Sequence, residues 1–213
     1  MLTRICIFVF FYNFAEIFLK MEKRICIFCS SSNKIAQAYF AAAETLAAEL
    51  ARKGHTIVCG GGSHGLMGQI INTAVENGGY VVGVIPEFMR AVEWDSKQLS
   101  QLIVVEDMRQ RKKQMIENAD AVIALPGGCG TLEELMEVIT LKRLGKFTKP
   151  IIILNTSGFY NQLESLLHKM MDENFMNKQS IDIWKLVDFP EQVLDAINNS
   201  IPWNSDAIKF AVV

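Results

Sequence analysis

The sequence predicts one α/β domain, built on a single doubly wound parallel sheet with helices on both of its faces. Short apolar runs alternate with longer amphipathic segments, and the short runs are apolar throughout rather than at every second position. Strands of that kind, separated by helices, are typical of a parallel sheet covered on both faces. The length of 213 residues, with 50% hydrophobic residues, suits one well-filled domain.

Seven apolar runs are the predicted strands: residues 24–29, 55–60, 80–86, 101–106, 121–126, 150–155 and 183–189. Six amphipathic segments are the predicted helices: residues 35–52, 65–79, 108–119, 131–144, 160–173 and 190–199. Residues 87–100 are expected to be irregular, and Trp203–Val213 a loosely held tail. In such a Rossmann-like order of elements, ligands bind beyond the carboxyl ends of the strands, near the point where the winding reverses.

Residues 1–21 are interpreted as an N-terminal extension that is not part of the native fold. They are apolar, but they contain Asn13 and Glu16 and lack both a small-residue cleavage site and an uninterrupted apolar span of about 20 residues. We therefore expect neither a signal peptide nor a membrane anchor. Because RICIF occurs at 4–8 and again at 24–28, with Met21 before the second copy, we expect the domain to span 22–200, with a tail over 201–213.

Charge and cysteine content exclude other classes of protein. A net charge of −2 and a pI near 6.0 provide no basic field for a nucleic-acid polymer. The five cysteines are an odd number scattered through apolar runs, which argues against a disulfide framework and favours the cytoplasm. Cys26 and Cys29 are interpreted as core thiols on opposite faces of a strand, because no second pair of Cys or His completes a metal site.

The stretch LPGGCGTLEEL at residues 125–135 has two interpretations. Its glycines let backbone N–H groups approach a ligand, and a helix start beyond them attracts an anion, which predicts a phosphate-binding loop. Thr131 followed three residues later by Glu134 also fits a capping box, which is a purely structural helix start. This stretch alone leaves both interpretations open.

Two further segments are predicted to lie at the same edge of the sheet. GGGSHG at 60–65 matches the dinucleotide pattern G-x-G-x-x-G, but it follows the second strand, and three consecutive glycines match many patterns. It is interpreted as a second phosphate- or sugar-facing loop rather than an NAD site. In DMRQRKKQM at 107–115, Arg111 and Lys112 lie in the opening turns of the helix predicted over 108–119, at the same edge as the glycine loop. A guanidinium there can meet a sugar, a phosphate or Glu134.

Five motifs in one order resemble the Lonely Guy family, long described as possible lysine decarboxylases. PGGCGTLEE matches the pattern P-G-G-x-G-T-x-x-E and MRQRK matches M-H-x-R-K, and the other three motifs are GGGSHGLMG, GVIPE and ILNTSGFY. The resemblance covers residues 23–197. It implies a nucleoside 5′-monophosphate phosphoribohydrolase, which cleaves the N-glycosidic bond of AMP or an N6-substituted cytokinin nucleotide to give the free base and ribose 5-phosphate.

The resemblance also implies roles for residues 22–200 as a nucleotide-binding catalytic domain. Its catalytic pair corresponds to Arg111 and Glu134. Its substrate-binding set corresponds to Glu93, Lys112, Gly128, Cys129, Gly130, Thr131, Leu132, Glu133 and Thr140, with Gly62 as a weaker member. It implies a homodimer that acts on a small nucleotide without a metal or cofactor.

The chain departs from the family pattern at three positions. Arg109 stands where the family has His, Ser30 where Gly is usual, and Cys129 where the residue is often aromatic. These departures concern the identity of the substrate more than the type of reaction. The alternative is a non-catalytic nucleotide or cofactor carrier, which would keep the glycine loop without needing Arg111 and Glu134 together. A lysine decarboxylase would need a Lys that binds pyridoxal phosphate and a supporting acid, and the sequence contains no recognisable set of that kind.

Overall fold

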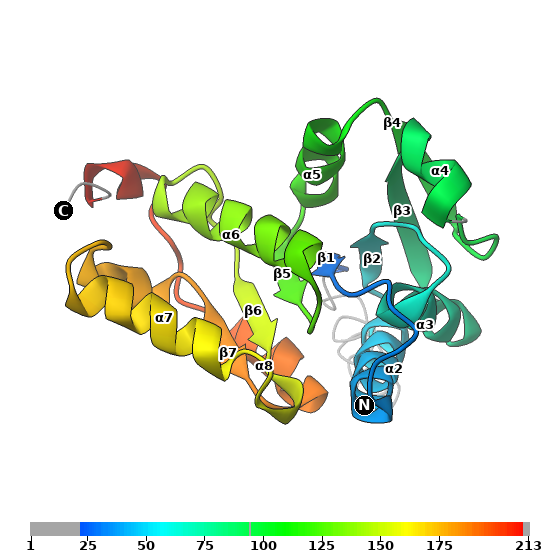
Figure 1. The fold of residues 1–213 in the computed structure, drawn as a ribbon, viewed down its shortest axis with the longest axis horizontal. Helices are drawn as coiled ribbons and strands as arrows, with labels where there is room; N and C mark the ends of the chain where they lie inside the picture. Colours follow the sequence, from blue (N-terminus) through cyan, green and yellow to red (C-terminus); the bar gives the residue numbers. More distant parts are fainter. Residues whose placement is uncertain (1–21, 94, 211–213) are drawn as a thin grey trace, which may run out of the picture.

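The computed structural model describes residues 22–93 and 95–210 and confirms the predicted α/β class. Seven parallel strands form one sheet in the order β4-β3-β2-β1-β5-β6-β7 (Figure 1). They are β1 Arg24–Phe28, β2 Thr56–Cys59, β3 Tyr80–Pro86, β4 Gln101–Val105, β5 Ala121–Ala124, β6 Ile151–Leu154 and β7 Lys185–Val187. The order reverses between β1 and β5, so the doubly wound topology is confirmed. The expected extension over residues 1–21 lies outside the described residues.

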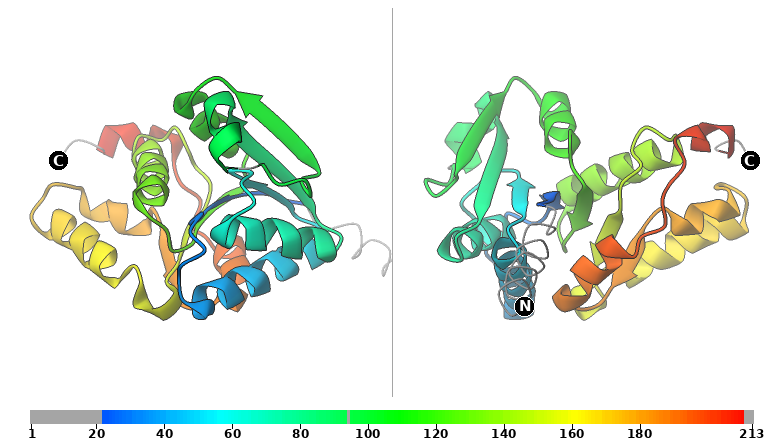
Figure 2. Two further views of the ribbon diagram at one scale, coloured as in Figure 1. Left: turned by 45° about the vertical axis from the view of Figure 1, so that its right-hand side comes forward. Right: turned by 180° about the vertical axis from the view of Figure 1, so that it is seen from behind.

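Helices cover both faces of the sheet (Figure 2). On one face pack α2 Gln37–Arg52, α3 Gly65–Glu76 and α8 Val193–Asn198, and on the other α5 Met108–Ile116, α6 Cys129–Arg143 and α7 Asn161–Asp172. Both sides of each central strand are therefore buried, which explains why the strands are apolar throughout. Cys29 packs in the first of these two cores and Cys26 in the second, which confirms that they are thiols on opposite faces.

The register places the ends of the central strands side by side. In β1, Ile25 is paired with Ile57 of β2 on one side and with Ala121 of β5 on the other. Phe28, the last residue of β1, is paired with Ala124, the last residue of β5. The segments that follow β1 and β5 consequently leave the sheet beside each other, at the point where the winding reverses.

Two segments differ from the sequence prediction. Residues 87–100, expected to be irregular, begin with a helix, α4 Glu87–Glu93. The expected loose tail is held against the end of α6: Trp203 Nε1 donates a hydrogen bond of 2.6 Å to the Lys142 carbonyl, and Ala207 is buried. The remaining short elements are 3-10 helices: η1 Thr156–Gly158, η2 Lys178–Asp182, η3 Pro190–Gln192 and η4 Ser205–Phe210.

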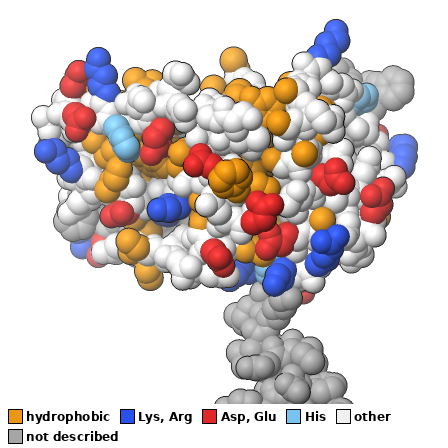
Figure 3. Space-filling view, turned by 90° about the horizontal axis from the view of Figure 1, so that it is seen from below, with side chains coloured by type: hydrophobic (Ala, Val, Ile, Leu, Met, Phe, Trp, Pro, Cys, Tyr) orange, Lys and Arg blue, Asp and Glu red, His pale blue; other side chains and the backbone are white. Residues whose placement is uncertain are grey.

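The surface and the helix lengths bear on the expected partners. Seen from below, acidic, basic and apolar side chains are interspersed rather than gathered by charge (Figure 3). Within residues 22–93 and 95–210, every helix is too short or too polar to cross a membrane.

Candidate active site

A cavity of about 420 Å³ lies at the carboxyl edge of the sheet, beyond β1, β2 and β5. Segments from both halves of the winding contribute to it, as expected for a switch-point site. Its lining consists of Ile27, Phe28, Cys29, Ser30, Ser31, Ser32, Gly60, Met67, Met89, Met108, Arg111, Met115, Gly128, Gly130, Thr131, Glu133 and Glu134. The structure thus brings six of the residues predicted for the site to one cavity: Arg111, Gly128, Gly130, Thr131, Glu133 and Glu134.

The glycine loop ends in a helix start that no side chain caps. Helix α6 begins at Cys129, with Gly128 as its N-cap, so Thr131 lies inside the first turn rather than at the cap. The capping-box interpretation of Thr131 and Glu134 is therefore wrong. The amides of Cys129, Gly130 and Thr131 make no hydrogen bond with any described residue, whereas the Leu132 amide bonds the Gly128 carbonyl at 3.1 Å. Three N–H groups at the positive end of the helix dipole are available to an anion.

The three glycines of this loop differ in what they allow. A Cβ at Gly127 would lie 2.1 Å from Thr131 Oγ1, so Gly127 is required by packing. A Cβ at Gly128 or Gly130 would meet no atom within 4 Å, and neither residue has a positive φ. Neither packing nor backbone conformation explains glycine at these two positions. The open space beside the bare amides is compatible with an anion bound there.

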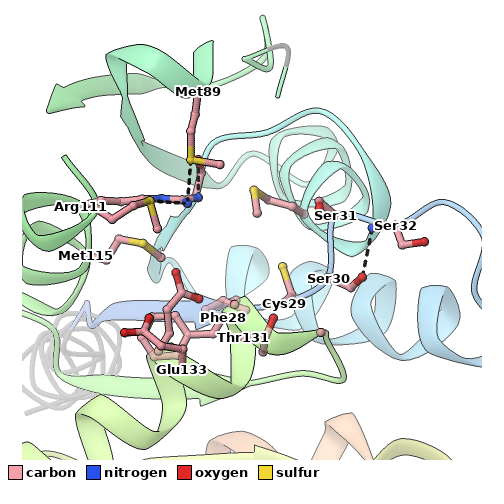
Figure 4. Close-up of a pocket in the computed structure, with 17 residues that line it drawn as sticks. Phe28, Cys29, Ser30, Ser31, Ser32, Met89, Arg111, Met115, Thr131 and Glu133 are labelled. Carbon is pink, nitrogen blue, oxygen red and sulfur yellow. Dashed lines mark hydrogen bonds between the residues drawn. The ribbon is translucent and has the colours of Figure 1, made fainter. Parts of the chain in front are cut away.

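Arg111 is held in the wall of the cavity by backbone carbonyls. Only 5% of it is exposed, and its Nε and Nη2 donate hydrogen bonds to the carbonyls of Val84 at 3.1 Å and Gly60 at 3.3 Å. Its Nη1 lies 3.8 Å from the sulfur atoms of Met89 and Met108. The side chain reaches across from α5 toward Met89 (Figure 4). A guanidinium fixed in this way is a permanent cation with a set position.

Glu134 brings a negative charge to the same cavity. It is half-buried in the second turn of α6 and lines the cavity together with Arg111. Both charges act on the buried thiol below them. Burial is the main reason that the pKa of Cys29 lies well above its ordinary value. The charges of Cys59 and Glu134 raise this pKa further, whereas the charge of Arg111 lowers it. A cation and a carboxylate therefore both lie near the end of β1.

Lys112 joins two helices rather than lining the cavity. Its Nζ is paired with Glu133 and, at 3.0 Å, with Glu137, so it links α5 to α6. The hydrogen bond that Lys112 donates to the Glu133 carboxylate raises the pKa of Lys112 above its ordinary value. Lys112 consequently fixes the distance between the helix that holds Arg111 and the helix that holds Glu134.

Four other described residues named from the sequence do not line the cavity: Leu132, Thr140, Cys129 and Gly62. Leu132 packs against the core under α6, and Thr140 is exposed near the other end of that helix. Cys129 is exposed at the helix start, and the Gly62 amide lies 3.0 Å from the Met67 sulfur. Glu93 ends α4, and its side chain falls outside what the structure describes.

Two groups of lining residues were not assigned to the site from the sequence. Ser30, Ser31 and Ser32 follow β1 and lie across the cavity from Arg111 (Figure 4). Their place at the carboxyl end of the first strand was a usable signal. Four methionines from α3, α4 and α5 form an apolar wall, and no local pattern marks them: Met67, Met89, Met108 and Met115.

A doubly wound sheet with a glycine loop at its switch point is typical of α/β proteins that bind small ligands at the carboxyl edge. Residues 67–197 match the family model described as "Possible lysine decarboxylase". The chain is 41% identical over 191 residues to cytokinin riboside 5′-monophosphate phosphoribohydrolase LOG2 of Arabidopsis thaliana. This match covers 89% of each chain. It is 47% identical over 156 residues to LOG7 of the same plant, which covers 73% of this chain and 71% of that one. The chain belongs to this family, the Lonely Guy family.

Solved structures agree on the fold. The molybdenum cofactor carrier protein of Chlamydomonas reinhardtii matches with a TM-score of 0.64 over 84% of this chain and 98% of that one. The sequence identity is 18%, so this likeness concerns the fold alone.

Proposed function

We propose that the protein hydrolyses the N-glycosidic bond of a nucleoside 5′-monophosphate, AMP or an N6-substituted cytokinin riboside monophosphate, and releases the free base and ribose 5-phosphate. One observation carries this proposal. Neither backbone conformation nor packing requires glycine at Gly128 and Gly130, yet both line the cavity of Arg111 and Glu134, next to helix amides that have no hydrogen-bond partner among the described residues. The names of the plant relatives support the same reaction.

The amides of Cys129, Gly130 and Thr131 would hold the 5′-phosphate. A phosphate at this position accepts hydrogen bonds from the backbone and gains from the helix dipole without any side-chain movement. Binding energy from a group remote from the reacting bond then places the anomeric carbon, C1′, within the cavity. The loop thus has a positioning role in the proposed reaction.

Glu134 would act at C1′. Breaking the bond between C1′ and the base nitrogen builds positive charge on the ribose, as in other glycosidic cleavages. A carboxylate beside that carbon stabilises the charge and orients or deprotonates the attacking water. Arg111, in the same cavity, would keep Glu134 ionised and bind a ribose or phosphate oxygen.

The remaining walls suit the other parts of a nucleotide. The hydroxyl groups of Ser30, Ser31 and Ser32 can bond sugar or base edges, and the methionine wall offers adaptable apolar contact to a flat base or its N6-substituent. Lys112 takes a supporting role in this proposal because it is paired with Glu133 and Glu137.

Lysine decarboxylation has less support. A pyridoxal phosphate enzyme needs a lysine that forms a Schiff base with the cofactor. Among the described residues that line the cavity there is no lysine. The lining of the cavity therefore does not support lysine decarboxylation.

The test is release of ribose 5-phosphate from AMP and from isopentenyladenosine monophosphate by the purified protein. We expect release from at least one of them. A carrier would instead bind a nucleotide tightly and release nothing, and that result would overturn the proposal.

We propose in addition that the protein is a cytoplasmic homodimer. Four free cysteines support a reducing compartment: Cys26, Cys29, Cys59 and Cys129. Exposed apolar side chains on and after α7, Leu166 and Phe175, support self-association. Light scattering coupled to size exclusion should give twice the chain mass of 23.9 kDa. A mass of one chain would contradict the dimer.

A further inference from the structure

A second cavity lies at the opposite edge of the sheet from the candidate active site. Its volume is about 260 Å³, and it contains Ile151 and Lys185, the first residues of β6 and β7. The rest of its lining is Lys142, Asp182, Ile183, Trp184, Ala196, Asn199, Ser200 and Ile201. We call residues 201–210 the C-terminal strap; it runs from the end of α8 to the end of α6 (right-hand view of Figure 2).

Lys142, in the last turn of α6, is an unusual side chain for this cavity because only 2% of it is exposed. Its Nζ makes no hydrogen bond or ion pair with any residue that the structure describes. Its aromatic neighbour is the Trp203 ring, whose centroid lies 5.7 Å from Nζ. Most of the side chain is withdrawn from water, but Nζ is not one of the fully enclosed polar atoms, and Lys142 lines the cavity. An ammonium in such a place without a hydrogen-bonded counterion is rare.

The C-terminal strap is anchored so that it covers Lys142. Trp203 Nε1 donates to the Lys142 carbonyl, which fixes the ring over this turn of α6. Gly145 has a φ of +68°, and a Cβ there would lie 2.0 Å from the Ser205 carbonyl oxygen, so the strap lies directly on the end of α6. The burial of Lys142 is therefore built into the fold.

The charges and the apolar lining define what this cavity would accept. Lys142 and Lys185 provide two cations against one carboxylate, Asp182, so the lining has a net positive charge. The carboxyl-terminal ends of α6 and α8 border the cavity, and their carbonyl groups disfavour anions, a multiply charged anion more strongly than a singly charged one. The apolar lining, which includes Ile151, Ile183 and Trp184, suits a hydrocarbon or aromatic body.

We propose that this cavity binds a small organic monocarboxylate, with the carboxylate on Lys142 Nζ and an apolar body against the adjoining isoleucine and tryptophan side chains. A volume of about 260 Å³ suits a molecule smaller than the drug-sized ligands that occupy cavities of about 300 to 1,000 Å³. The bound carboxylate replaces the missing counterion of Lys142.

The probe is sodium benzoate, titrated into the full chain at pH 7 by calorimetry and by the fluorescence of Trp184 and Trp203. We expect saturable binding that Lys142→Met weakens at least tenfold, while the matched variant of an exposed lysine nearby, Lys146→Met, binds as the wild type does. Benzyl alcohol, the neutral analogue, should bind at least tenfold more weakly than benzoate. Absence of benzoate binding up to 10 mM, about the limit of weak small-ligand affinity, would overturn the proposal.

A second measurement is independent of whether Lys142→Met folds. Burial lowers the pKa of Lys142 to about 8, with Asp182 opposing that shift. Asp182 and Lys185 line the cavity as well, and Arg143 follows Lys142 in the chain. Loss of the Lys142 proton should weaken benzoate binding about tenfold between pH 7 and pH 9. Lys142→Arg, which stays charged, should remove most of that dependence. Equal binding of benzoate and benzyl alcohol, or a pH dependence unchanged in Lys142→Arg, would contradict recognition by Lys142.

Discussion

The wall that holds Arg111 can be disturbed by adding one methyl group at Gly60. A Cβ at this position would lie 2.1 Å from Arg111 Nη2, and ordinary contact begins at 3.4 Å, so restoring ordinary contact moves the guanidinium by 3.4 − 2.1 = 1.3 Å. The methyl group would also lie 2.9 Å from the Met67 methyl carbon, the end of another flexible side chain. Gly60 has no positive φ, so alanine fits its backbone conformation.

Gly60→Ala should therefore fold but lose activity. A misplacement of about 1 Å in a positioned group can cost about 100-fold in rate, which is about 2.7 kcal/mol of transition-state stabilisation. The assay is kcat/KM for ribose 5-phosphate release, with thermal unfolding as the check on folding. We expect the melting temperature to fall by roughly 5 to 10 °C, because the displaced guanidinium loses its buried hydrogen bonds to the carbonyls of Val84 and Gly60.

A double-mutant cycle with Arg111→Ala tests the cause of that loss. If Gly60→Ala acts by moving the guanidinium, the double variant should be no less active than Arg111→Ala alone. Full activity of Gly60→Ala would refute a positioned Arg111. Losses that add in the double variant would show that Gly60 acts by a different route.

Three other predictions concern the loop, the carboxylate and the buried lysine. Gly130→Ala should leave the melting temperature unchanged or raise it, since its Cβ would meet no atom. The KM for AMP should rise at least tenfold, because the methyl group would occupy the space of the phosphate. An unchanged KM would show that the phosphate binds elsewhere. Glu134→Gln should lower kcat by about 100-fold or more, whereas Glu137→Gln, outside the cavity, should lower it less than about tenfold; equal losses would show that Glu134 has no special role. Lys142 has a folded-state pKa of about 8, below the value of about 10.4 for an unfolded lysine, so it binds fewer protons when folded and stability is gained as pH rises. The measurement is the free energy of unfolding in urea, for the wild type and for Lys142→Met. The wild type minus Lys142→Met difference should increase by about 2 kcal/mol between pH 7.5 and pH 10. A difference that does not change with pH would contradict the lowered pKa.

The sheet could be predicted from the sequence because both of its faces are covered. Burial on both sides forces the strands to be apolar at every position, and such runs stand out between amphipathic helices. The helix over Glu87–Glu93 could not be predicted, since seven residues after a proline contain too few turns to show a helical period. The predicted start of α6 lies two residues after the observed start at Cys129. The N-cap, Gly128, has no side chain that marks it in the sequence, whereas Thr131 has the side chain of a typical N-cap.

The candidate site was predicted in part. The carboxyl-edge rule placed Arg111 and the glycine loop together, because both follow strands that end at one edge of the sheet. The carbonyls that hold Arg111 come from Val84 and Gly60, 27 and 51 residues away, and no local pattern specifies such contacts. The pairing of Lys112 with two acids of α6 depends equally on how the two helices pack.

The most direct test of the account is a crystal structure of Glu134→Gln with AMP bound. We predict that the 5′-phosphate accepts hydrogen bonds from the amides of Cys129, Gly130 and Thr131, and that C1′ faces the side chain at position 134. A nucleotide bound with its phosphate away from these amides, or with C1′ turned from that side chain, would contradict it.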